Sequence, residues 1–313
     1  MERIILDVDT GEDDAIAIEL ARGLSDKIKV EALIATAGNV ALRHTLPNTL
    51  NIRDAVKLDA PVYRGSERPL KRDVVDASSF HGENGLAGPV FPPRKEEIIE
   101  DAIDNAIKII MSNPGEITFV SVGPYTDLAR MMMREPKIKK ALKRIVVMGG
   151  SLSGGNASDW AEFNIFGDPE AADIVFSSGV EVVMMALDIT LRVILTEEIY
   201  ERIKALRESA YKRLILSQLS FYIPANMKSH GTMPAMHDPC TILYLYDNSI
   251  FTFERKSIRV ELEDEEKYGM TYESDGEKNV LFATGVDLDK FWHYCFNSFE
   301  KLADVMDENL YFC

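Results

Sequence analysis

The chain has 313 residues, with 35 Lys and Arg against 51 Asp and Glu, so its formal net charge at pH 7 is −16. Its hydrophobic content of 46% is too high for a disordered protein, and no apolar run approaches the roughly 18 residues that a membrane-spanning helix needs. The excess of acids argues against nucleic acid as the main partner, because phosphate binding relies on clustered Lys and Arg. We therefore expect a soluble globular protein of enzyme size.

Cysteine usage and the N-terminal sequence both bear on the cellular compartment. The three cysteines, Cys240, Cys295 and Cys313, are scattered without the spacing of a metal site. Such usage is natural in a reducing cytosol. The N-terminal MERIILDVD enters an apolar run without the basic region and cleavage site of a signal peptide. These features predict a cytoplasmic protein.

Short β-branched runs alternate with longer amphipathic stretches through the first part of the chain. This alternation indicates βαβ units and a parallel sheet that is buried on both faces. The predicted strands are Arg3–Val8, Lys29–Thr36, Glu116–Val122, Arg144–Met148 and Glu181–Leu187, and the predicted helices are Asp13–Leu24, Thr45–Lys57, Glu96–Ser112, Asp127–Arg134 and Asp168–Ser177.

The pattern changes after Asp188, but no linker or internal repeat marks a domain boundary there. We expect one domain over residues 1–313, with an α/β fold in which helices flank an open, mostly parallel central sheet and the C-terminal portion is rich in helices and β-hairpins. The later predicted segments are a helix over Thr196–Tyr222, a loop over Ile223–Pro239, strands over Ile250–Arg255, Ser257–Leu262, Met270–Glu273 and Val280–Ala283, and a helix over Asp287–Met306.

A dense group of acids follows the first predicted strand, in the segment DVDTGEDDA that begins at Asp7. In open α/β sheets ligands bind beyond the carboxyl ends of the strands, where these acids fall. A single acid here would most simply cap the next helix, but several buried carboxylates repel one another unless a cation is present. Carboxylate oxygens are the ligands that Ca²⁺ and Mg²⁺ prefer. The segment therefore predicts a divalent metal site.

Two further polar segments carry candidate functional groups. His237 and Asp238 precede Pro239, and together they offer a general acid and a metal ligand, although each alone is more often structural. The loop GGNASDWAEFN ends near Glu162 and offers amide and carboxylate groups that suit hydroxyl groups better than phosphates. An ordinary polar turn-rich loop is the alternative for this segment.

The order and spacing of these blocks identify a resemblance over nearly the whole chain. The sequence resembles the inosine-uridine-type nucleoside hydrolases, which are calcium-dependent N-ribohydrolases. The matching blocks are DVDTGEDDA (7–15), TAGN (36–39), HGENGL (81–86), VGPYTDLA (122–129), MGG (148–150), GNASDWAEFN (155–164), DPEAA (168–172) and HDPC (237–240).

The resemblance implies an enzyme that hydrolyses the N-glycosidic bond of ribonucleosides to ribose and free base. It implies Ca²⁺ as cofactor, a calcium-bound water as nucleophile, Asp9 as the base and His237 as the acid beside the leaving group. It also implies a homodimer or homotetramer. The implied calcium ligands are the carboxylates of Asp9, Asp14 and Asp238 and the carbonyl of Val122; the implied substrate-binding residues are Asp13, Asn39, Asn156, Glu162 and Asn164 around the ribose, and His81 near the nucleobase.

Four positions depart from the usual family pattern without removing an implied ligand. Thr10 and Glu12 replace a proline and an apolar residue, Asp127 replaces an asparagine, and Asn84 replaces an aspartate. We expect a broad or pyrimidine-leaning base preference. In the family this preference depends on the stretch ahead of the HDP block, here Phe221, Tyr222, Asn226, Met227 and His230.

Two alternative functions stay open at this point. DVDTG after a strand also resembles the nucleophile segment of aspartate-based phosphatases, but that function leaves the Asn and Glu blocks without a role. A non-catalytic ribonucleoside-binding protein with a retained metal site is the second alternative. It would bind ribonucleoside without releasing ribose.

Overall fold

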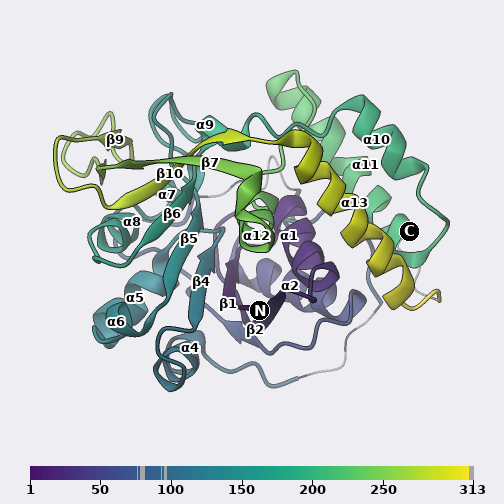
Figure 1. Ribbon diagram of the computed structural model, residues 1–313, viewed down its shortest axis with the longest axis horizontal. Helices are drawn as coiled ribbons and strands as arrows, with labels where there is room; N and C mark the ends of the chain where they lie inside the picture. Colours follow the sequence, from purple (N-terminus) through teal and green to yellow (C-terminus); the bar gives the residue numbers. More distant parts are fainter. Residues whose placement is uncertain (76, 78–81, 93, 95–96, 310–313) are drawn as a thin grey trace.

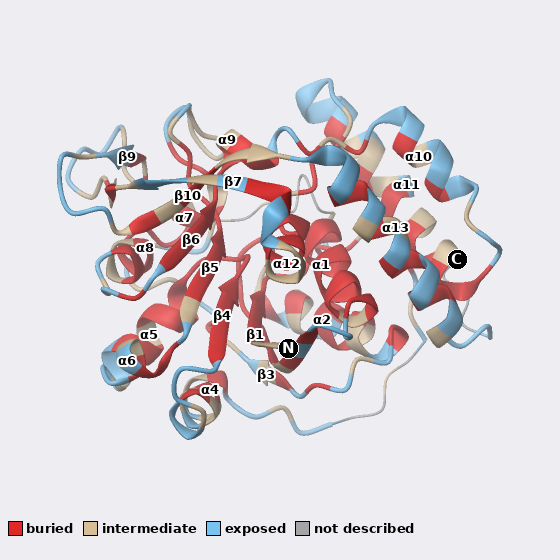
Figure 2. Cartoon of the chain, viewed as in Figure 1, coloured by how far each residue is buried: buried red, intermediate tan, exposed pale blue. Residues whose placement is uncertain are grey.

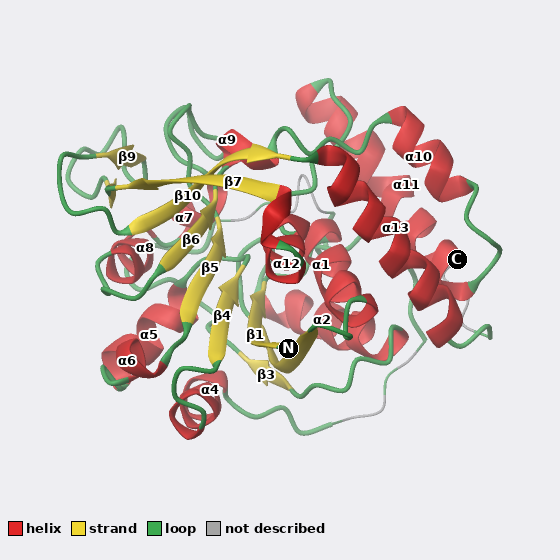
Figure 3. Cartoon of the chain, viewed as in Figure 1, coloured by secondary structure: helices red, strands yellow, loops and turns green. Residues whose placement is uncertain are grey.

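The computed structural model describes residues 1–75, 77, 82–92, 94 and 97–309, so His81 lies outside the described residues. Its central feature is an eight-stranded sheet with the order β3-β2-β1-β4-β5-β6-β10-β7, which Figure 3 shows in yellow. Among the residues described, none of the helices is both long enough and apolar enough to cross a membrane.

The sheet is parallel from β3 through β10, and only the edge strand β7 pairs antiparallel with its neighbour. This confirms the expected α/β fold with a mostly parallel sheet. Strands from both ends of the chain, β1 and β10, belong to this one sheet. This topology supports a single domain over residues 1–313, and the single domain stays a prediction. The strands are β1 (Glu2–Val8), β2 (Ile28–Ala35), β3 (Val62–Arg64), β4 (Ile117–Ser121), β5 (Arg144–Met148), β6 (Val182–Met185), β7 (Phe251–Lys256) and β10 (Val280–Val286), with a separate pair β8 (Ile258–Val260) and β9 (Thr271–Glu273).

Helices cover both faces of the sheet (Figure 1). Side chains alternate along a strand, so Ile4 and Leu6 enter one hydrophobic core and Ile5 enters the other. Figure 2 shows the resulting buried layers in red on both sides of the strands. One core is built with α1 (Glu12–Gly23), α2 (Leu42–Ala55), α9 (Leu187–Thr190), α10 (Glu197–Lys204), α11 (Ala210–His230), α12 (Pro239–Tyr246) and α13 (Leu288–Val305), and the other with α4 (Ala102–Ser112), α5 (Thr126–Arg134), α6 (Ile138–Ala141), α7 (Phe163–Gly167) and α8 (Pro169–Phe176).

The predicted loop over Ile223–Pro239 is wrong in its first part, because α11 continues to His230 with Pro224 inside it. A proline in a helix costs one backbone hydrogen bond, but the packing of a buried helix face can outweigh that loss. The helix ends where Gly231 takes a left-handed conformation with a φ of 71° and donates its N–H to the carbonyl of Met227.

Two predicted helices also have different bounds in the structure. The stretch Thr196–Tyr222 is not one helix, since α10 ends at Lys204 and the Ser209 hydroxyl caps the start of α11. The predicted helix over Glu96–Ser112 begins only at Ala102, after Asp101. In both cases a side chain accepts a hydrogen bond from the first turn and so fixes a later start.

Candidate functional site

The functional groups gather beyond the carboxyl ends of the central strands, as the sheet rule predicts. After β1 the chain passes through Asp9 and Gly11 into the first turn of α1. The segment after β2 lies beside it, because the N–H of Asn39 donates to Asp9 Oδ2 at 2.7 Å. The turn after β4 lies on the other side of β1, since β1 pairs with both β2 and β4.

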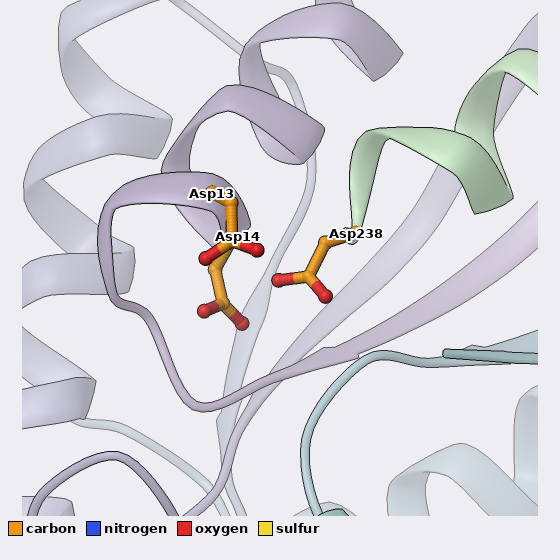
Figure 4. A group of neighbouring side chains, drawn as sticks. All are labelled: Asp13, Asp14 and Asp238. Carbon is orange, nitrogen blue, oxygen red and sulfur yellow. The ribbon is translucent and has the colours of Figure 1, made fainter. Parts of the chain in front are cut away.

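Three buried carboxylates form the core of the site. Asp13 and Asp14 stand in the first turn of α1, and Asp238 stands directly before α12. Ligand oxygens of these three residues all lie within 4.8 Å of one another. Figure 4 shows the carboxylate of Asp238 facing those of Asp13 and Asp14. We call Asp13, Asp14 and Asp238 the acidic cluster.

The position of Asp238 argues for a ligand rather than a helix cap. It occupies the N-cap position of α12, ahead of Pro239, but its side chain makes no capping hydrogen bond. Asp238 is 4% exposed, and its carboxylate points toward Asp13 and Asp14 instead. Capping, the simplest explanation for an acid at this position, does not account for its orientation.

Asp14 links the acidic cluster to Asp9. Its two carboxylate oxygens accept hydrogen bonds from the backbone N–H groups of Asp9 at 3.1 Å and Gly11 at 3.0 Å. The side-chain amide of Asn39 donates to Asp14 Oδ2 at 3.2 Å. Since each carboxylate oxygen has two lone pairs, these bonds orient Asp14 and leave acceptor capacity for a cation.

Asp9 is enclosed by the turns that follow β2 and β4. A side chain at Gly38 would overlap Asp9 Oδ2, and a Cβ at Gly123 would lie 2.9 Å from Asp9 Oδ1. Backbone can approach this carboxylate so closely only because both positions are glycine. The Asp9 carboxylate is therefore held in one place, next to the acidic cluster.

The electrostatics of the site call for a positive charge. Burial raises the pKa of Asp238 well above its ordinary value, and repulsion from Asp13, Asp14 and Asp9 raises it further. Burial raises the pKa of Asp9 in the same way, with repulsion from Asp14 as the next cause. Carboxylates in this situation take up protons or bind a cation. The all-oxygen donor set fits Ca²⁺ or Mg²⁺.

The loops after β4 and β5 complete the rim of the site. The Asn164 amide donates to the carbonyl of Val122 at 2.6 Å and to that of Met148 at 3.2 Å. Glu162 caps α7 and accepts from the Gly150 N–H at 2.8 Å. Burial raises the pKa of Glu162 to about 7. Glu162 is near enough to the acidic cluster to raise the pKa of Asp238.

His237 lies next to Asp238 and is half-buried. Its Nδ1 is 2.8 Å from the hydroxyl of Thr190, at the end of α9. We did not single out Thr190 from the sequence, although α9, the short helix that it ends, comes straight after β6, and the strand-end rule applied there would have drawn attention to this segment.

The predicted residues differ in how closely the structure brings them together. Val122 and Glu162 lie on neighbouring loops and Asn164 in the first turn of α7, beside one connected group that consists of Asp9, Asp13, Asp14, Asn39 and Asp238. Asn156 is exposed, and its Oδ1 accepts the N–H of Phe163 at 2.8 Å, so that oxygen serves the loop itself. Among the residues proposed for base preference, Tyr222 and Asn226 are buried, Phe221 is half-buried, and Met227 and His230 are exposed.

Comparison with known proteins gives a consistent family. The family described as "Inosine-uridine preferring nucleoside hydrolase" matches residues 4–293. An inosine-uridine preferring nucleoside hydrolase of Leishmania major is 36% identical over 313 residues, covering 96% of this chain and 98% of the relative. The pyrimidine-specific ribonucleoside hydrolase RihA of Salmonella typhimurium is 38% identical over 272 residues, covering 86% and 87%. A solved purine-preferring ribonucleoside hydrolase from Gardnerella vaginalis superposes with a TM-score of 0.90 at 31% identity, covering 97% of this chain and 100% of that one.

Proposed function

Because the chain belongs to the inosine-uridine preferring nucleoside hydrolase family, it is a nucleoside N-ribohydrolase, and we propose that it works with Ca²⁺ held at the acidic cluster and Asp9. The observation that carries this proposal is the buried acidic cluster, whose ligand oxygens lie within 4.8 Å of one another at the carboxyl ends of the strands. The phosphatase alternative leaves Asn39, Glu162 and Asn164 without a role.

The proposed cation ligands are the carboxylates of Asp9, Asp14 and Asp238 and the carbonyl of Val122. When bound, the cation offsets the repulsion between the carboxylates and makes a coordinated water more acidic. The Val122 carbonyl already accepts from Asn164, but a carbonyl oxygen has a second lone pair for a ligand. Calcium suits this set because it accepts carboxylate and carbonyl oxygens in flexible geometry.

Asp9 is the proposed base. Its Oδ2 accepts the Asn39 N–H, and its closely packed position keeps the carboxylate from turning away. A carboxylate held in this way is placed to accept a proton from a water bound beside it. In the proposed reaction Asp9 takes the proton of the water that attacks the anomeric carbon, while the bond from that carbon to the base nitrogen breaks.

The remaining polar groups are proposed to hold the ribose. Breaking the N-glycosidic bond develops positive charge on the sugar, which surrounding carboxylates and amide oxygens stabilise. These groups carry no positive charge of their own, so they favour hydroxyl groups over phosphate. The proposed ribose-binding residues are Asp13, Asn39, Asn156, Glu162 and Asn164, and His81 is proposed near the nucleobase.

His237 is the proposed acid that protonates the departing base. We expect His237→Ala to lower hydrolysis of nucleosides by about 10²–10⁴-fold, the usual contribution of general acid catalysis. In nitrophenyl riboside the leaving group is nitrophenolate, which departs without protonation. The same variant should therefore lose much less activity on this substrate. Steady-state kinetics on both substrates measure the difference, and an equal loss on both would assign His237 a positioning role instead.

Removal of the cation is expected to abolish activity. A reducing-sugar assay over inosine, uridine, cytidine and adenosine should detect ribose from at least one of them, with no release after chelation and recovery on addition of Ca²⁺. Recovery with Mg²⁺ in place of Ca²⁺ would correct the identity of the ion. Ribose release that persists in chelator would refute the metal-dependent mechanism, and binding of nucleoside without any ribose release would identify a non-catalytic binding protein.

We propose a broad or pyrimidine-leaning base preference and a cytoplasmic homodimer or homotetramer. The names of the relatives cover inosine-uridine, pyrimidine and purine preferences, so the same substrate panel decides the preference of this chain. The aromatic Phe221 and Tyr222 stand on α11 and could stack on either kind of base. Burial raises the pKa of Tyr222 well above its ordinary value and the charge of Asp13 raises it further, so this ring lies near the acidic cluster. Sedimentation of the purified protein measures the assembly.

A further inference from the structure

We propose that Thr190 is a positioning residue for His237, whose hydroxyl fixes the imidazole so that Nε2 faces the departing base. The inference rests on the proposed acid role of His237. Its starting point is the 2.8 Å distance between Thr190 Oγ1 and His237 Nδ1. The two residues belong to segments far apart in the chain, one at the end of α9 and one directly before α12.

The Thr190 hydroxyl is itself firmly held. Thr190 is fully buried, and its backbone N–H donates to the carbonyl of Ala186 at 3.0 Å within α9. A buried β-branched side chain has few accessible rotamers, so the hydroxyl occupies a defined position. The imidazole of His237 is only half-buried, so packing restrains it less than it restrains the Thr190 side chain. The hydrogen bond therefore holds the imidazole against a side chain that is itself fixed in position.

The backbone around both residues is fixed independently of this hydrogen bond. The segment after α9 pairs with the segment before His237, because the Leu195 N–H donates to the Pro234 carbonyl at 2.9 Å and the Met236 N–H donates to the Val193 carbonyl at 2.8 Å. Loss of the Thr190 hydroxyl leaves these backbone bonds in place. A variant at Thr190 should thus fold and change the imidazole specifically.

The direction of the hydrogen bond gives the chemical consequence. The protonated imidazole that acts as a general acid carries a proton on each ring nitrogen. Its Nδ1–H then donates to the Thr190 hydroxyl oxygen, and its Nε2–H lies on the side of the ring away from Thr190. Transfer of the Nε2 proton to the departing base leaves a neutral ring whose Nδ1–H still donates to Thr190. Without the hydroxyl this hydrogen bond is lost, and Nε2 is held less firmly toward the leaving group.

A pair of substitutions separates the hydroxyl from its packing. Thr190→Val keeps the branched shape and removes the hydroxyl, whereas Thr190→Ser keeps the hydroxyl and removes a methyl group. We expect Thr190→Val to lower kcat on nucleosides about 10-fold, the size of one lost hydrogen bond to a functional group. We expect Thr190→Ser to stay within about threefold of wild type. A purely structural role of Thr190 predicts the reverse order or equal effects.

The decisive experiment combines these variants with His237→Ala on two substrates, a nucleoside and nitrophenyl riboside. Thermal unfolding first verifies that each variant folds. Support for the inference is a loss by Thr190→Val on the nucleoside, a much smaller loss on nitrophenyl riboside, and no further loss when Thr190→Val is added to His237→Ala. Additive losses, or Thr190→Ser as impaired as Thr190→Val, would overturn it.

The same set of variants distinguishes failure of this inference from failure of the proposed acid role. If His237→Ala hydrolyses nucleosides as fast as wild type, both the acid role and the role of Thr190 are wrong. If His237→Ala shows its full selective loss while Thr190→Val behaves as wild type, only the inference about Thr190 is overturned.

Discussion

Substitution of Asp9 by alanine is expected to lower ribose release by at least about 10³-fold, because one change removes both a general base and a proposed cation ligand. The Asp9 carboxylate accepts the Asn39 N–H at 2.7 Å, and the turns at Gly38 and Gly123 pack directly against it. No other acid can move into this enclosed position without displacing backbone. The kcat/KM on the best nucleoside in saturating Ca²⁺ measures the loss.

Asp9→Asn separates the two roles of this residue. The amide oxygen still accepts the Asn39 N–H and offers a neutral ligand, but it cannot take a proton near neutral pH. We expect Asp9→Asn to bind Ca²⁺ more tightly than Asp9→Ala and to be about as inactive. Calcium titration by calorimetry, run beside the kinetics, reports binding without turnover.

Asp127→Asn is the matched control for Asp9. Asp127 is also a fully buried acid at this end of the sheet, but its carboxylate accepts from the N–H and hydroxyl of Ser66 and is not a proposed ligand. We expect activity within about threefold of wild type. An Asp9→Ala variant no slower than Asp127→Asn would remove Asp9 from the mechanism.

The regular part of the fold was predictable because long periodic segments carry a strong signal. The predicted strand Arg144–Met148 coincides with β5, and β1 and α1 differ from their predicted bounds by one residue at most at either end. The elements that the prediction omitted are short, such as β3, α7 and α9, and such segments carry almost no periodicity. Their stability comes from tertiary contacts, as when Glu162 caps α7 with its side chain.

The sequence predicts the site residues that stand at strand ends in recognisable blocks. It does not predict the contacts that join two segments distant in the sequence. The acids after β1 and the pair before α12 fall in the first class. The bond from Asn164 to Val122 and the contact between Thr190 and His237 fall in the second. Their partners are 42 and 47 residues apart in the sequence. The sheet order brings the first pair together, and backbone pairing between the segments after α9 and before α12 brings the second pair together.

A buried acid outside the site is expected to make stability fall as the pH rises. Glu19 is fully buried where α1 meets α11, with Gln218 donating to it at 2.7 Å and Tyr211 at 3.1 Å. Burial raises the pKa of Glu19 from 4.5 to about 8 in the folded protein, against the lowering effect of those two donors. The folded state thus holds a proton that the unfolded state has already lost.

The sign of the effect follows from this difference in bound protons. Between pH 4.5 and about 8 the folded protein binds more protons at Glu19, so its free energy of unfolding decreases as the pH rises. The stabilisation that Glu19 gives to the folded state is complete below pH 4.5 and is lost once the pH passes about 8. A pKa rise of this size corresponds to several kcal/mol, at most roughly 5.

Glu19→Gln is expected to remove this pH dependence and to raise stability most at pH 8 and above. The amide carries no charge at any pH, and it brings a donor to Gln218 Oε1, which is buried with no hydrogen-bond partner within the described part of the chain. Denaturant unfolding of wild type and variant between pH 5.5 and 9 measures the difference. Saturating Ca²⁺ in every sample suppresses titration of the acidic cluster, so the comparison isolates Glu19.

Tyr211→Phe is the control that keeps the Glu19 carboxyl and removes one of its donors. Because the Tyr211 hydroxyl lowers the pKa of Glu19, its loss should raise that pKa further and extend the pH dependence to higher pH. Glu19→Gln and Tyr211→Phe should therefore change the stability profile in opposite directions. Profiles for wild type and Glu19→Gln that run parallel from pH 5.5 to 9 would show that Glu19 stays charged in the folded protein. The polar contact between α1 and α11 would then join a charged carboxylate to two neutral hydrogen-bond donors.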